Sequence, residues 1–313
     1  MRRLGALAVL ASLTMFACSD GETGPAGPAG PSGSQGPAGP AGPAGQDGMD
    51  FPGPVPAAYT AADGIAGGAA YSKWWTDGAS ASGPQLTPPT TDAPADFYRC
   101  KACHAWDGLG NAASYANRTG QSSLAAGRPD VSSVNLRSAT RARTYQALHD
   151  LIAHEGARGI DARDNTHPDY TTVLTSEQIW NLVKFMREEW VNPSDLYDVE
   201  VTGPQMYVDY SQVPPVLMAP TVTFSNVGAK GNVTRGKSVY NTKCRGCHGT
   251  DGTQLDIGGN SLGQLVRTKP HEVWFKAKFG EDGTGMMPGL VTSLQDLQDL
   301  YAALADAADY PDL

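Results

Sequence analysis

Two short segments of the same form, Cys-x-x-Cys-His, constrain this 313-residue chain more than any other feature. They consist of Cys100, Cys103 and His104, and of Cys244, Cys247 and His248. Two thiols separated by two residues on a helical turn can bond to the two vinyl groups of one haem, and the adjacent imidazole then binds the iron. The sequence therefore predicts two covalently bound haem c groups. A zinc site or a redox dithiol is the alternative for such a pair, and the repetition of the whole segment argues against it.

The start of the chain has the pattern of an exported protein. Residues 1–17 combine a basic start with an apolar run that is too short to cross a bilayer as a mature helix, which predicts a signal peptide. The small residue before Cys18 resembles a bacterial lipobox, so we expect Cys18 to be lipidated; an ordinary leader with a stray cysteine is the alternative, because Met15 replaces the usual leucine. Ser19 resembles the sorting signal of outer-membrane lipoproteins. The expected location is the outer membrane, at its periplasmic face or at the cell surface.

A collagen-like repeat follows the predicted lipid anchor. Every third residue from Gly21 to Asp50 is glycine, and Pro-Ala fills most triplets. Glycine at this period lets three polyproline-II chains meet at a crowded axis, which favours a homotrimer. A single-chain, semi-rigid spacer explains the same composition without partner chains. Residues 18–56 are therefore assigned as the lipidated N-terminus and a stalk, with both interpretations open.

The remainder of the chain looks like two copies of one unit. A segment Gly68–Tyr71 precedes the first motif and Gly236–Tyr240 precedes the second, and each copy ends in a capped amphipathic helix, Ser176–Val183 or Ser293–Leu300. The copies resemble class I cytochromes c, which implies a mostly α fold of two small helical domains, each built around its haem. The predicted boundaries are a first domain at 57–197, a linker at 198–230 with one or two strands, and a second domain at 231–313.

That resemblance also implies a methionine as the sixth iron ligand, placed before the C-terminal helix and often followed by proline. In the second domain Met287 precedes Pro288 at the expected place, and Met286 is its rival. Both could instead be ordinary core fillers. In the first domain His167 precedes a proline at the corresponding position, so we predict that His104 and His167 ligate haem 1.

Other side chains could ligate haem 1 in place of His167. His149 and His154 stand on a predicted helix from Thr140 to Glu155, and their spacing puts them on different faces, so at most one of them could reach the iron. Met186 is a further competitor. Two imidazoles favour Fe(III) and a thioether favours Fe(II), so the predicted ligands make haem 1 the low-potential centre and haem 2 the high-potential one.

Several further residues are candidates for contact with the haems. Three aromatic side chains are candidates to pack at haem 1, namely Trp106, Trp180 and Phe185, and two at haem 2, namely Trp274 and Phe275. All five are equally well explained as ordinary core aromatics, and the sequence assigns them no role in electron conduction. Arg137 and Arg267 are candidates to neutralise haem propionates. His271, directly after a proline, is expected to begin a helix and not to bind haem.

Electron transfer is the function that these features favour, with a redox partner protein or an extracellular acceptor as the partner. The formal charge of −9 argues against nucleic acid as a partner. Four of the five cysteines belong to the motifs and the fifth is Cys18, so none remains for a disulfide. A dihaem oxidoreductase, such as a peroxidase or a sulfur-compound oxidising enzyme with an open site at haem 1, is the alternative, and a trimeric surface fibre is a third interpretation.

Overall fold

The computed structural model describes residues 53–75, 99–110, 113–114, 116, 135–156, 169–204 and 207–313. All of them belong to one compact unit, Gly45–Leu313. The predicted signal peptide, the predicted lipidation site Cys18, the collagen-like repeat and the predicted ligand His167 lie outside the described residues.

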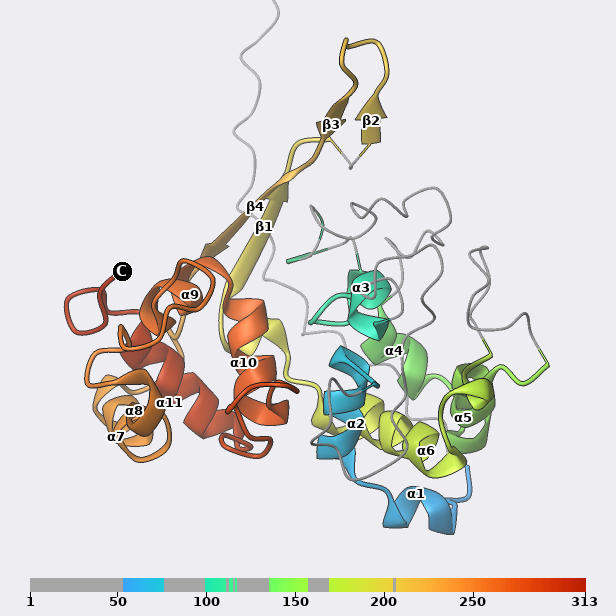
Figure 1. Ribbon diagram of the computed structural model, residues 1–313. Coiled ribbons are helices and arrows are strands. Elements are labelled where there is room, and N and C mark those ends of the chain that lie inside the picture. Colours follow the sequence, from blue (N-terminus) through green and yellow to red (C-terminus); the bar gives the residue numbers. More distant parts are fainter. Residues whose placement is uncertain are drawn as a thin grey trace, which may run out of the picture. The chain divides into compact units, whose positions relative to one another are not determined.

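The described residues form mostly helices, as expected (Figure 1). The first domain contains α1 (Ala57–Ala61), α2 (Gly64–Ser72), α3 (Cys100–His104), α4 (Leu136–Arg141), α5 (Tyr145–Ala153), α6 (Ser176–Lys184) and the short turns η4 (Tyr170–Thr172), η5 (Phe185–Glu189) and η6 (Pro193–Asp195). The second contains α7 (Val233–Lys243), α8 (Arg245–His248), α9 (Leu262–Thr268), α10 (Pro270–Phe279) and α11 (Leu294–Leu304). Among the described helices, none is long and apolar enough to traverse a lipid bilayer.

Both terminal helices begin at the caps that the sequence indicates. Thr175 caps α6 in a capping box with Gln178, and the Ser293 side chain caps α11 by accepting a hydrogen bond from the backbone N–H of Asp296. Their apolar stripes are buried, since Ile179 and Leu297 are each at most 1% exposed. The two predicted helices are therefore present, each with its apolar face in the core.

In each domain the first long helix crosses the terminal helix in the same register. The backbone N–H of Asp63, the N-cap of α2, donates to the Asn181 side chain at 2.7 Å, and that of Asn232, the N-cap of α7, donates to Asp299 at 2.7 Å. Asn181 and Asp299 each stand six residues after the cap of their own helix. The two domains are therefore built as repeats of one helix pair.

A glycine four residues after each N-cap allows the close crossing. A Cβ on Gly67 would overlap the carbonyl oxygen of Asn181, and a Cβ on Gly236 would overlap that of Asp299. The register thus differs by one residue from the alignment of Gly68 with Gly236, because Gly68 instead faces the ring of Phe279.

The single helix expected from Thr140 to Glu155 is two helices. Thr140 belongs to α4, and the Thr144 side chain accepts a hydrogen bond from the backbone N–H of Ala147 to begin α5. His154 then ends α5 in a left-handed conformation with φ 48°. A competing N-cap inside the segment therefore overrode its continuous helical pattern.

The linker forms more strands than expected. β1 (Asp198–Thr202) pairs antiparallel with β4 (Thr221–Ser225), and β2 (Tyr207–Asp209) pairs antiparallel with β3 (Val216–Met218). Together they form one long hairpin arm, in which β1 and β4 pair near the helices and β2 and β3 pair farther out (Figure 1). Only the alternating segment of β4 was apparent from the sequence, because the other strands depend on pairing across the hairpin.

The buried carboxylate of Asp299 gives the second domain an acid-sensitive contact. Asp299 is 2% exposed, and the Arg235 guanidinium, 2.7 Å from it, lowers its pKa from 3.8 to about 2. A carboxyl whose folded-state pKa is depressed stabilises the fold above its unfolded-state pKa and loses that contribution as the pH falls through its folded-state pKa. The stabilisation should therefore be complete above about pH 4 and decline toward pH 2.

We expect Asp299→Asn to remove this pH dependence. The Arg235 side chain is 61% exposed and screened by water, so the loss at pH 7 should be only about 1 kcal/mol. Asparagine fits because Asn181 holds the equivalent place in the first domain. Urea unfolding of the full-length protein between pH 2 and 7 measures both quantities. An unchanged acid limb in the variant would contradict the assignment.

Candidate haem-binding sites

Each motif lies on one short helical turn. The backbone N–H of His248 donates to the carbonyl of Cys244 at 3.0 Å, and the N–H of Gly249 donates to that of Arg245 at 2.9 Å. In α3 the N–H of Ala105 donates to the carbonyl of Lys101 at 2.9 Å. Residues three and four apart share a helix face, so each turn brings two thiols and one imidazole to the same side.

The residue after each histidine leaves the helix in the same unusual conformation. Ala105 has φ 62° and ψ 176°, and Gly249 has φ 82° and ψ −171°. The hydroxyl of Tyr71 donates to the carbonyl of Ala105 at 2.7 Å, and the hydroxyl of Tyr240 donates to that of Gly249 at 2.8 Å. In both domains the first long helix therefore fixes the turn that carries the histidine.

The protonation states of the donor atoms fit a haem that binds through thioethers and imidazole. Burial lowers the pKa of His104 to about 4 and also lowers that of His248, so both are neutral at pH 7, as an iron ligand must be. Burial raises the pKa of Cys100 to about 12 and that of Cys244 to about 11. Without a bound metal both thiols are therefore protonated at pH 7, unlike the thiolate of a reactive redox cysteine.

The described residues hold no group of three or more histidine, cysteine, aspartate or glutamate side chains that could bind a metal ion by themselves. They do hold the buried indole N–H of Trp106, two residues after His104, without a protein partner. A buried donor needs an acceptor, and the two propionates of a haem are acceptors. The residues present therefore fit haem, which would supply one-electron chemistry at iron.

The two candidate methionines lie on one loop after α10. Met286 is partly buried against the core, its carbonyl accepts a hydrogen bond from the N–H of Glu281 at 3.0 Å, and the side chain of Met287 is 64% exposed. The loop is tied back to the helix by the N–H of Gly289, which donates to the carbonyl of Lys278 at 2.8 Å. Both methionines therefore remain predicted ligands.

The ring of His149, a competing ligand for haem 1, contacts other side chains in the structure. Its two ring nitrogens lie 3.1 Å from the Ser176 hydroxyl and 3.2 Å from an Asp150 carboxylate oxygen, and its ring stacks on Trp180 at 4.5 Å. Met186, a second competitor, is buried in η5. These contacts hold His149 against α6, and His154 ends α5. The sixth ligand of haem 1 stays a prediction, with His167 as the first candidate.

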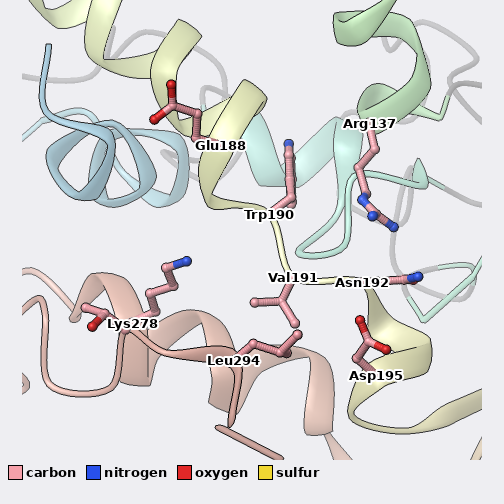
Figure 2. A pocket seen from close by; sticks show the side chains of 9 residues that line it. Arg137, Glu188, Trp190, Val191, Asn192, Asp195, Lys278 and Leu294 are labelled. Atoms are coloured by element: carbon pink, nitrogen blue, oxygen red, sulfur yellow. The ribbon is translucent and has the colours of Figure 1, made fainter. Parts of the chain in front are cut away.

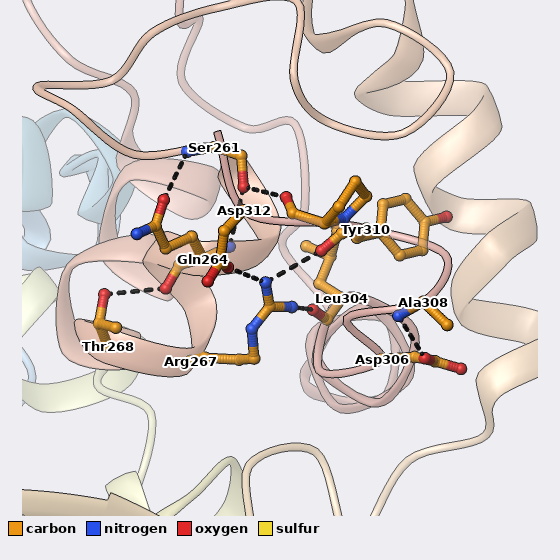
Figure 3. Close-up of polar contacts among 10 residues, drawn as sticks. Ser261, Gln264, Arg267, Thr268, Leu304, Asp306, Ala308, Tyr310 and Asp312 are labelled. Carbon is orange, nitrogen blue, oxygen red and sulfur yellow. Dashed lines mark hydrogen bonds and ion pairs between the residues drawn. The ribbon is translucent and has the colours of Figure 1, made fainter.

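The remaining assignments differ in outcome. Arg267 donates to the carbonyls of Leu304 and Tyr310 at 2.9 and 3.0 Å and pairs with Asp312 at 2.5 Å, so it fastens the C-terminal segment (Figure 3). Its propionate role stays a prediction beside these contacts. His271 is the second residue of α10, at the start of a helix as expected.

Sequence reasoning missed Asn181 and Asp299, which join the two long helices of each domain. Each stands six residues after the N-cap of its helix, Thr175 or Ser293. This equal spacing in the two domains could have indicated that the residues are equivalent. Neither residue belongs to a recognisable motif, because the contact that each makes is with a backbone group far away in the chain.

Comparison with known families agrees with this geometry. Residues 93–190 match the family model for cytochrome c, and residues 231–303 match the model for cytochrome c oxidase, cbb3-type, subunit III. Neither a curated protein nor a solved structure matches the chain. Each matched region contains one Cys-x-x-Cys-His motif. The chain thus carries two cytochrome c domains and is a dihaem cytochrome c, which implies electron transfer to and from redox partners.

Proposed function

We propose that this dihaem cytochrome relays electrons at a bacterial outer membrane or cell surface, between a membrane-associated donor and a redox partner protein or an extracellular acceptor. The observation that carries the proposal is the same hydrogen bond at both motifs. The hydroxyl of Tyr71 or Tyr240 donates to the carbonyl of the residue after the motif histidine. A carrier needs two centres held rigidly, since its work is positioning and tuning. The acidic charge of −9 favours a partner with a basic surface.

Within this proposal the two centres differ in ligation. His104 and His167 bind haem 1, whereas His248 binds haem 2 together with Met287 or its neighbour Met286. The first pair stabilises Fe(III) and the second stabilises Fe(II), so electrons flow downhill from haem 1 to haem 2. The neutral state of His104 and His248 supports their part in this ligation.

Intact mass and carbon monoxide binding test the carrier against the enzyme. Protein matured in a host that attaches haem c should weigh two haems more than its mature polypeptide, because four thioether bonds survive denaturation. Neither reduced haem should bind carbon monoxide, since all six iron positions are filled. A polypeptide without added haem would end the proposal. Carbon monoxide binding at haem 1 would show an open position and support the dihaem oxidoreductase.

The lipid anchor has its own test. Cys18→Ala should release the protein from the membrane fraction, because the predicted acyl chains are attached at that residue. Ser19→Ala is the matched control and should remain in the membrane pellet. Fractionation followed by haem staining measures both. Retention of Cys18→Ala in the pellet would contradict lipidation at this site.

A further inference from the structure

The two cytochrome domains share one buried core. Aromatic side chains from both domains meet in a cluster, here called the seam, that comprises Tyr71, Trp106, Phe185, Trp190, Trp274, Phe275 and Phe279. Except for the partly buried Trp190, each of them is at most 2% exposed. The last three belong to α10 of the second domain. The seam therefore joins the two domains through closely packed, buried side chains rather than through a hydrated interface.

A polar edge borders the seam (Figure 2). A pocket of about 300 Å³ lies there, lined by Arg137 and Trp190 from the first domain and by Lys278 and Leu294 from the second. The Lys278 ammonium group donates to the Glu189 carbonyl at 3.0 Å and pairs with its carboxylate at 2.8 Å. Lys278 is 6% exposed, so this contact is a buried tie between the domains.

Phe275 is the seam residue of the second domain that contacts the surroundings of the first Cys-x-x-Cys-His motif. Its ring lies 4.7 Å from that of Trp106, which follows the predicted iron ligand His104 by two residues. It also lies 5.9 Å from the ring of Tyr71, whose hydroxyl bonds to the residue directly after His104. Two short connections from the first motif therefore converge on one side chain of the second domain.

The same helix reaches the second haem site at its other end. The carbonyls of Ala277 and Lys278 accept hydrogen bonds from the N–H groups of Val291 at 3.0 Å and Gly289 at 2.8 Å. These two bonds tie α10 to the loop that carries the predicted ligands Met286 and Met287. A continuous series of bonds and packed contacts thus runs from His104 through Phe275 to that loop.

We propose that Phe275 is the positioning residue for electron transfer between the two haems, with Trp106 and Tyr71 as its contacts on the side of haem 1. This inference rests on the proposed function. In the holoprotein one electron would pass from the haem held at His104 to the haem held at His248. The first iron would go from Fe(II) to Fe(III) and the second from Fe(III) to Fe(II), so the step balances. No proton or group moves with it. Packed contacts couple the sites better than a gap, because a void has no atoms to bridge it.

Intramolecular electron transfer in the full-length holoprotein tests this role. After rapid photoreduction, absorbance at wavelengths that separate the two haems gives the rate at which they equilibrate. Phe275→Leu should slow that rate several-fold, while the midpoint potentials stay unchanged. Phe275→Met keeps the side-chain volume and should fold even where the leucine variant does not, and it should slow the rate as well.

Phe279→Leu is the matched control, because Phe279 lies on the same helix and in the same seam. Its ring packs on Phe275 at 4.6 Å and on Phe185 at 5.1 Å, on the side of Phe275 away from the contact with Trp106 at 4.7 Å. This variant should leave the rate unchanged. Equal slowing in the Phe279 and Phe275 variants, or an unchanged rate in both Phe275 variants, would overturn the inference. Protein without two redox-active haems would instead overturn the proposed function, so the two failures are distinguishable. Thermal unfolding of each variant separates a lost contact from a lost fold.

Discussion

Gly236→Ala should destabilise the second domain by about 2–4 kcal/mol, although it adds only a single methyl group. The added Cβ would overlap the carbonyl oxygen of Asp299, which is backbone and cannot swing aside. Helices α7 and α11 would have to move apart, and the hydrogen bond from Asn232 to Asp299 would be lost with the crossing. Because domains are stable by only about 5–15 kcal/mol, such a loss is a large share of the total.

Chemical denaturation of the holoprotein measures this loss, with helix content and haem absorbance as separate signals. Gly246→Ala is the matched control: it also adds one methyl group to a helix of the second domain, and a Cβ there meets no atom within 4 Å. The control should be neutral or slightly stabilising, since alanine favours helix over glycine. Equal unfolding midpoints for the two variants would show that the crossing can relax around a side chain.

The terminal helices were predictable because their signals are local. Thr175 and Gln178 form the capping box of α6, and Ser293 caps α11, so the sequence contains both the start and the buried face of each helix. The Cys-x-x-Cys-His turns are local as well. Both could be inferred without knowing which distant residue packs against them.

The pairing of the helices was harder to predict, because it depends on contacts between distant residues. In the second domain α7 leads directly into Cys244, whereas in the first domain residues 73–99 separate α2 from Cys100. The repeat was recognised in spite of this insertion, but its register was one residue off. Gly67 differs from Gly68 in lying against the carbonyl oxygen of Asn181. The pattern of apolar residues does not indicate which glycine makes such a backbone contact.

The aromatic residues show the same limit. An apolar pattern indicates that Trp274 and Phe275 are buried but not which partner they bury against. The sequence leaves open whether they pack at haem 2 or in the core. In the structure they pack in the seam with side chains of the first domain, Phe275 against Trp106 at 4.7 Å and Trp274 near Trp190 at 6.4 Å. The second domain thus uses part of its core to hold the first.

His167→Met should raise the midpoint potential of haem 1 by on the order of 0.1 V and leave haem 2 unchanged. The predicted imidazole ligand favours Fe(III), and a thioether in its place favours Fe(II), so the exchange stabilises the reduced state. The driving force for electron flow toward haem 2 would shrink with it. A potentiometric titration followed by visible absorbance should show two separate waves in the wild type, with only the lower one shifted in the variant.

His149→Gln is the control for this ligand exchange, because His149 is the competing histidine whose ring nitrogens face Ser176 and Asp150. Glutamine can keep a polar contact to α6, so both potentials should stay at their wild-type values. If His149→Gln shifts the lower wave and His167→Met does not, His149 would be the ligand, and α5 would have to turn it away from Trp180 when haem binds. A lower wave that moves only with His167 establishes bis-histidine ligation at haem 1, and with it the direction of the electron between the two domains.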